Sequence, residues 1–187
     1  LWRGVSLVIL DPTHWRHVYW ATRTVDSNRR TATVLADWEF ASDHREFSDL
    51  HVQLTLSRHG QVIHESEHSV THTHGQAHLT LDDIDLWWPR GYGVPALYHA
   101  SAKLMDQDGR ILAEHVSHIG IRTIDLCRTD MTTPEQPGEF VFVVNGERIF
   151  VKGTNWVPLD AFHSRDAEHL PEVFNMLVDL NCNMVRC

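Results

Sequence analysis

Residues 31–40 read TATVLADWEF, and apolar side chains alternate with polar ones along this stretch. The even positions from Ala32 to Phe40 are all apolar, and the odd positions are polar apart from Leu35. Successive side chains of a β-strand point to opposite faces of the sheet. A period of two therefore predicts a strand with one buried face.

The same alternation recurs along the first two-thirds of the chain, at residues 18–22, 52–57, 62–64, 77–81, 98–104 and 111–116. Turn-forming residues separate the segments, and no helical period of useful length interrupts them. About seven short strands over roughly 110 residues predict a mainly β fold. We expect an immunoglobulin-like β-sandwich over residues 16–127. The Cys–Trp–Cys pattern of antibody domains is missing, so the predicted sandwich lacks their disulfide.

The composition changes at residues 128–138, which form a polar linker rich in proline and glycine. Beyond it, two apolar runs, Phe140 to Val144 and Ile149 to Val151, flank Asn145-Gly146. Asn-Gly between apolar runs predicts a hairpin, in which Glu147 and Arg148 either pair or lengthen the loop. Residues 153–160, GTNWVPLD, are predicted to be a loop because of their glycine and proline.

The end of the chain has a helical period. Leu170, Val173, Phe174 and Leu177 follow at i, i+3, i+4 and i+7, which predicts an amphipathic helix of about 12 residues. Residues 183–187, NMVRC, predict another strand. Strand, loop, helix and strand in this order are typical of an α/β repeat. A (β/α)8 barrel needs about 250 residues, so residues 139–187 would supply only its incomplete first elements.

Such incomplete elements would leave apolar strand edges open, and we expect the isolated chain to self-associate through them. The side chains concerned are Phe142, Phe150, Val151, Met184 and Val185.

The charge balance restricts the partners. The chain of 187 residues carries 16 basic and 25 acidic side chains, for a net charge of −9 with histidine neutral. Nucleic acids and anionic membranes bind basic surfaces, so neither is expected as a partner. No apolar run approaches the roughly 20 residues of a membrane span. No pattern in the sequence indicates a cofactor.

Histidine is unusually frequent, with 15 residues. His72 and His74 would share one face of a strand, so both could reach a metal ion, and a metal site is one interpretation. No cysteine, aspartate or glutamate within residues 69–78 completes such a site, so a polar surface that titrates near pH 6–7 is the preferred interpretation.

Several segments resemble glycoside hydrolase family 2, in the order found in that family. Residues 1–5, LWRGV, are similar to the end of its N-terminal sugar-binding-like domain, which we place at residues 1–15. Residues 85–93, DLWWPRGYG, followed by Leu97-Tyr98, resemble a segment of its immunoglobulin-like domain, and residues 120–124, GIRTI, resemble the close of that domain.

The later segments resemble the start of the family's catalytic barrel. Residues 142–146, FVVNG, and 150–158, FVKGTNWVP, look like its entry, and residues 183–186, NMVR, resemble its second strand. Residues 155–162, NWVPLDAF, are more like β-mannosidases than β-galactosidases, and exo-acting glucosaminidases are similar as well.

The resemblance implies a retaining, exo-acting hydrolase of terminal β-linked sugars, which uses two carboxyl groups about 5–5.5 Å apart. In the family both are glutamates on later barrel strands, and no position here corresponds to either. The five glutamates of the C-terminal third are expected to be structural or solvated: Glu135, Glu139, Glu147, Glu168 and Glu172. The resemblance therefore implies a fragment that is inactive alone and serves as a structural spacer and part of the pocket rim.

The rim would be formed by residues that follow barrel strands. Asn155, Trp156 and Asp160 follow the first such strand, and Arg186 lies near the end of the second. Trp156 could stack on a sugar, Asp160 could accept hydroxyl hydrogen bonds, and Arg186 could orient a catalytic carboxylate. In the structural alternatives, Trp156 is a packing residue, Asp160 is a loop or capping residue, and Arg186 forms a structural ion pair.

Two alternatives remain open. Trp87 and Trp88 are expected to be packing residues of a connecting loop, and a sugar-stacking platform is the other interpretation. The whole chain could also be a stand-alone β-sandwich that binds carbohydrate or protein. Such a module would have no use for the unfinished βα pattern after residue 139.

Overall fold

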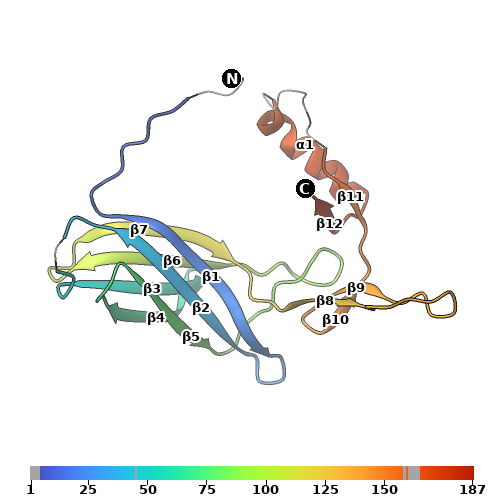
Figure 1. Cartoon of the computed structure of the whole chain (residues 1–187), viewed down its shortest axis with the longest axis horizontal. Helices are drawn as coiled ribbons and strands as arrows, with labels where there is room; N and C mark the ends of the chain where they lie inside the picture. The colour runs from blue at the N-terminus through green and yellow to red at the C-terminus, as the bar shows by residue number, and fades with distance from the viewer. Residues whose placement is uncertain (1–4, 45, 158, 160–164) are drawn as a thin grey trace. The chain divides into compact units, whose positions relative to one another are not determined.

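The computed structural model describes residues 5–44, 46–157, 159 and 165–187 (Figure 1). The chain divides into two compact units. The sandwich unit consists of Ile9–Trp87 and Pro95–Thr123. The C-terminal unit consists of Trp88–Val94 and Ile124–Cys187, together with the N-terminal residues up to Val8.

The sandwich unit has the seven strands that the alternation predicts, each running antiparallel to its neighbours. One sheet has the order β1-β2-β5 and the other the order β4-β3-β6-β7. In a constant-type immunoglobulin domain the fourth strand joins the sheet of the first two, whereas here β4 pairs with β3. The strands are β1 (His14–Asp26), β2 (Thr31–Ala41), β3 (Leu50–Arg58), β4 (Gln61–Ser69), β5 (His74–Leu81), β6 (Tyr98–Asp106) and β7 (Ile111–Ile119).

The core of this unit is formed by the alternate residues of the central strands. The even positions of β2 from Ala32 to Phe40 are all buried, as predicted. Val52, Leu54 and Leu56 of β3 have no exposed surface. Burying each such leucine contributes about 1.5–3 kcal/mol, so this face fixes the register of both sheets.

Tyr98, the first residue of β6, is fully buried and connects the core to the chain that precedes it. Its hydroxyl accepts the Asp85 N–H at 2.7 Å and donates to the Asp85 carbonyl at 3.1 Å. Arg58 donates to the same hydroxyl at 3.2 Å and pairs with the Asp85 carboxylate at 2.7 Å. The arrangement resembles the tyrosine corner of immunoglobulin domains, in which a tyrosine hydroxyl holds upstream backbone.

The C-terminal unit begins with an antiparallel sheet of order β10-β9-β8: β8 (Ile124–Arg128), β9 (Phe140–Val144) and β10 (Glu147–Ile149). Glu147 pairs with Val144, so Asn145 and Gly146 form a two-residue turn with φ of 52° and 86°. The predicted hairpin is confirmed, and Glu147 and Arg148 lie in its second strand. The β8 strand falls largely within the range expected for the sandwich but pairs with β9.

The last elements are β11 (Gly153–Asn155), α1 (Asp166–Asp179) and β12 (Met184–Arg186). The predicted helix and final strand are confirmed, and β11 and β12 pair in parallel. The loop prediction for residues 153–160 is wrong at Gly153–Asn155, because this backbone pairs with β12. A Cβ atom at position 153 would collide with the Met184 carbonyl, so only glycine allows the close approach. In the described part of the chain, no helix is long and apolar enough to cross a membrane.

His68, His72 and His74 line one pocket together with the buried Trp38. His68 is half-buried, with its ring centroid 5.9 Å from that of Trp38. Burial and, to a smaller extent, the neighbouring His64 lower the pKa of His68. The His72 and His74 rings stack at 6.0 Å. Among the described residues, no three His, Cys, Asp or Glu side chains are grouped in a way that could hold a metal ion.

Removal of the Tyr98 hydroxyl tests the corner. We expect Tyr98→Phe to lower the free energy of unfolding by about 1–3 kcal/mol, because the partly buried polar groups of Asp85 and Arg58 lose a partner. Denaturant unfolding measures the change. Tyr19→Phe is the matched control, since Tyr19 is 61% exposed. Equal midpoints for the two variants would show that the hydroxyl does not stabilise the corner.

The lowered pKa of His68 predicts an acid-sensitive contribution to stability. Below about pH 6.5 His68 binds a proton more readily in the unfolded chain than in the folded one. The free energy of unfolding therefore decreases as the pH is lowered. We expect His68→Gln to lose less stability than the wild type between pH 8 and pH 5 in denaturant titrations. His78→Gln, at an exposed position of β5, should keep the wild-type slope. Identical slopes for the two variants would contradict the prediction.

Candidate functional site

The candidate site lies where the parallel strands β11 and β12 end. Asn155 and Arg186 are the last residues of these strands and are register partners. Arg186 Nη1 donates to Asn155 Oδ1 at 3.4 Å, and both residues are exposed. Parallel neighbours end at the same edge of their sheet, which explains why residues 31 positions apart meet here. The pair presents a guanidinium and an amide to solvent.

Trp156 follows directly and is held on two sides. Its N–H donates to the Arg186 carbonyl at 2.7 Å, which continues the β11–β12 ladder. Its ring stacks on Phe174 of α1, with centroids 5.7 Å apart and planes at 27°. One face of the ring is therefore used in packing. The stacking of a sugar on this tryptophan stays a prediction, as does the role of Asp160, which lies outside the described residues.

Asn183, which was not among the predicted site residues, fixes the amino ends of the two strands. Its Nδ2 donates to the Phe150 carbonyl at 3.0 Å, and its Oδ1 accepts the Lys152 N–H at 2.8 Å. Its own N–H donates to the Lys152 carbonyl at 2.7 Å. The sequence signal was weak, because an asparagine before a strand more often belongs to a turn.

The glutamates of this unit are not placed as general acids. Glu135, Glu139, Glu147, Glu168 and Glu172 are all exposed. Glu139 pairs with Arg148 at 2.6 Å, and the hydrogen bond and charge of Arg148 lower the pKa of Glu139. A general acid at neutral pH needs a raised pKa, which is the opposite of the direction found for Glu139.

The two neighbouring tryptophans each pack on a glycine. The ring of Trp87 leaves no room for a Cβ atom at Gly120, and the guanidinium of Arg122 lies 4.7 Å from the ring centroid. Trp88 covers Gly93 in the same way. Both tryptophans are half-buried. These contacts suit packing residues.

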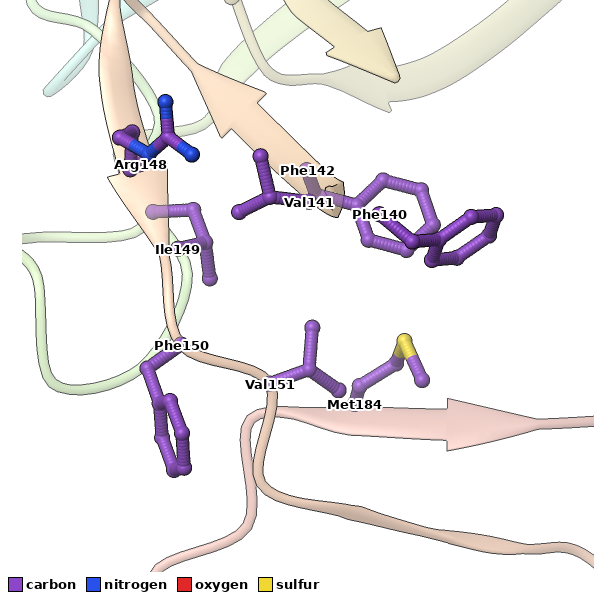
Figure 2. Close-up of a pocket in the computed structure, with 8 residues that line it drawn as sticks. All are labelled: Phe140, Val141, Phe142, Arg148, Ile149, Phe150, Val151 and Met184. Atoms are coloured by element: carbon purple, nitrogen blue, oxygen red, sulfur yellow. The ribbon is translucent and has the colours of Figure 1, made fainter. Parts of the chain in front are cut away.

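An apolar hollow of about 550 Å³ lies beside the hairpin. In Figure 2, Val151 and Met184 lie on one side of the hollow, opposite residues 140–142 of β9. Phe140 and Phe150 at its border are 71% and 74% exposed. Arg148 is the one charged lining residue described, so the hollow suits an apolar protein surface better than a sugar.

The model of the glycosyl hydrolases family 2 matches residues 13–122. β-Mannosidase B of Aspergillus niger is 32% identical over 161 residues, which are 86% of this chain and 18% of that protein. β-Mannosidase B of Aspergillus clavatus is 34% identical over 172 residues, 83% of this chain and 19% of that protein. The chain thus spans about a fifth of the length of these relatives.

Solved structures show the same fold. The β-D-mannosidase of Dictyoglomus thermophilum superposes with a TM-score of 0.78 at 24% identity, covering 95% of this chain and 21% of that one. The β-glucuronidase of Bifidobacterium dentium has a TM-score of 0.73 at 21% identity, covering 92% and 27%. With its family match over more than half its length and its β-mannosidase relatives, the chain belongs to glycosyl hydrolase family 2 and is β-mannosidase-like.

Proposed function

We propose that the chain is part of a retaining, exo-acting β-mannosidase-like glycosidase that hydrolyses terminal β-linked sugars. The proposal rests mainly on the pair Asn155 and Arg186 at the common end of two parallel strands. In (β/α)8 enzymes, residues at the carboxyl ends of the strands contact the substrate. The identity to β-mannosidases over more than four-fifths of the chain supports the sugar class.

In this proposal β11, α1 and β12 are the first elements of a (β/α)8 barrel, and the sandwich is a structural spacer. Later residues of the longer protein supply the remaining barrel and both catalytic glutamates. The exposed glutamates of this chain lack the burial that would tune them for catalysis. The chain alone is therefore inactive.

Each rim residue has a role in the proposal. Arg186 orients a catalytic carboxylate through a charge-assisted hydrogen bond, and Asn155 limits the positions that the guanidinium adopts. Trp156 offers the ring face opposite Phe174 to a sugar, and Asp160 accepts hydrogen bonds from sugar hydroxyls. The ligand is a β-linked sugar, with no cofactor in the reaction.

The activity is tested with the longer enzyme and with this chain. We expect the enzyme to hydrolyse an aryl β-mannoside faster than the matching β-galactoside and β-glucuronide, with retention at the anomeric carbon by NMR.

Arg186→Met should lower kcat/KM by roughly 100-fold through misplacement of a carboxylate, and Arg23→Met, at an exposed sandwich position, should not. Turnover by the 187-residue chain alone, or inversion of configuration, would refute the proposal.

We further propose that the isolated chain self-associates through the face formed by Phe140, Phe150 and the hollow beside them. Phe140→Ser and Phe150→Ser should each weaken association by roughly tenfold, since a buried phenylalanine contributes about 1.5–3 kcal/mol. Sedimentation equilibrium measures this. Val62→Ser is the control, because Val62 is 59% exposed on β4. A wild-type chain that stays monomeric at high concentration would exclude the association.

A further inference from the structure

The loop Trp88–Val94 of the C-terminal unit is built as a rigid turn. Tyr92 N–H donates to the Pro89 carbonyl and Trp88 N–H to the Val94 carbonyl, both at 3.1 Å. Gly91 has a φ of +84°, which the third position of such a turn requires and which favours glycine. The Trp88 ring lies against Gly93 where a Cβ atom would not fit. The loop therefore holds the side chains of residues 90 and 92 in fixed directions.

One of these side chains reaches the end of α1. Arg90 Nη2 donates to the Val178 carbonyl at 2.9 Å. Asn181 N–H donates to the same carbonyl, also at 2.9 Å. The last turn of α1 has no basic residue of its own, although the carbonyl end of a helix favours a cation. Arg90 thus supplies a charge that the helix lacks.

The other side chain reaches the start of the parallel strands. The Tyr92 hydroxyl accepts the Phe150 N–H at 2.7 Å. The Phe150 carbonyl accepts Asn183 Nδ2 at 3.0 Å, and Asn183 Oδ1 accepts the Lys152 N–H at 2.8 Å. These bonds run continuously from the loop to the residues directly before β11 and β12.

The register of the strands transmits this restraint to the candidate site. Gly153 pairs with Met184 at one end, and Asn155 pairs with Arg186 two residues further on. With three residues in each strand, the position of the first pair sets the position of the last. Tyr92 holds the amino ends of the strands β11 and β12 through Phe150, and Arg90 holds the helix α1 that joins these strands.

We infer that Arg90 and Tyr92 are positioning residues for the side chains at the carboxyl ends of β11 and β12. Tyr92 sets the strand register through Phe150 and Asn183, and Arg90 holds α1 against the turn. Neither residue contacts substrate. The kinetic part of the inference rests on the proposed function, whereas the structural part holds for this chain alone.

Amide hydrogen exchange in the 187-residue chain tests the structural part. In Tyr92→Phe we expect the Phe150 amide to exchange about three- to tenfold faster, as loss of one hydrogen bond allows. The Trp156 amide, which donates to Arg186, should also exchange at least about twofold faster, while amides of β3 keep their protection. Tyr19→Phe is the control for loss of a tyrosine hydroxyl. A change at Phe150 without one at Trp156 would overturn the positioning role.

Arg90→Met removes the hydrogen bond from the loop to the end of α1 and provides a second test if Tyr92→Phe does not fold. The Trp156 amide should exchange faster in Arg90→Met and return toward the wild-type rate in Arg90→Lys, which keeps the cation near the helix end. Equal exchange in Arg90→Met and the wild type would overturn the role of Arg90.

Kinetics of the longer enzyme test the functional part. Tyr92→Phe and Arg90→Met should lower kcat on the aryl β-mannoside about three- to thirtyfold and change KM less than about twofold, because small misplacements near the reacting atoms reduce the rate. Altered exchange with unchanged kcat would overturn the functional part. An inactive wild-type enzyme would instead overturn the proposed function and leave the exchange test decisive for the positioning role.

Discussion

The hydrogen bonds between the Tyr98 hydroxyl and the backbone of Asp85 are the constraint from which the rest of the structure follows. The hydroxyl has no access to water, so its donor and its acceptor both need protein partners. Asp85 provides both through its main chain, and Arg58 adds a charge to the cluster. The connection between β5 and β6 is thereby fixed to the core at Asp85. Trp88, where the rigid turn begins, follows three positions later in the sequence.

The parallel pair β11–β12 depends on restraints from other elements more than on its own ladder. Each strand has three residues, and a parallel ladder is slightly less stable per residue than an antiparallel one. The amide of Asn183 compensates by bonding the backbone on both sides of Val151. Gly153 allows the strands to approach closely, and the indole of Trp156 packs on α1. The functional side chains thus stand on a short scaffold that side-chain hydrogen bonds keep in register.

The sequence predicted those parts of the fold that local patterns encode. Alternation identified β2 because its buried face repeats every second residue, and Asn145-Gly146 identified a hairpin because both residues adopt a positive φ. The strand β11 was missed, because Gly153 to Asn155 have no apolar pattern and pair with residues 31 positions away. The partner of β8 was missed because it lies beyond the predicted linker, in β9. Asn155 and Arg186 were named from the resemblance, whereas Asn183 emerged from its backbone contacts.

The two units differ in where their stability comes from, and this difference bears on function. The strands β3 and β6 carry side chains with no exposed surface, whereas α1 has no buried residue among those described. Segments with few buried contacts open locally at low cost in free energy. A site at the ends of β11 and β12 therefore needs restraints that do not rely on burial, and hydrogen bonds to backbone groups are suited to this because they are directional. Arg90, Tyr92 and Asn183 all bond to backbone atoms. The precision of the candidate site then depends on the geometry of a few polar contacts, whereas most of the described buried apolar residues belong to the sandwich.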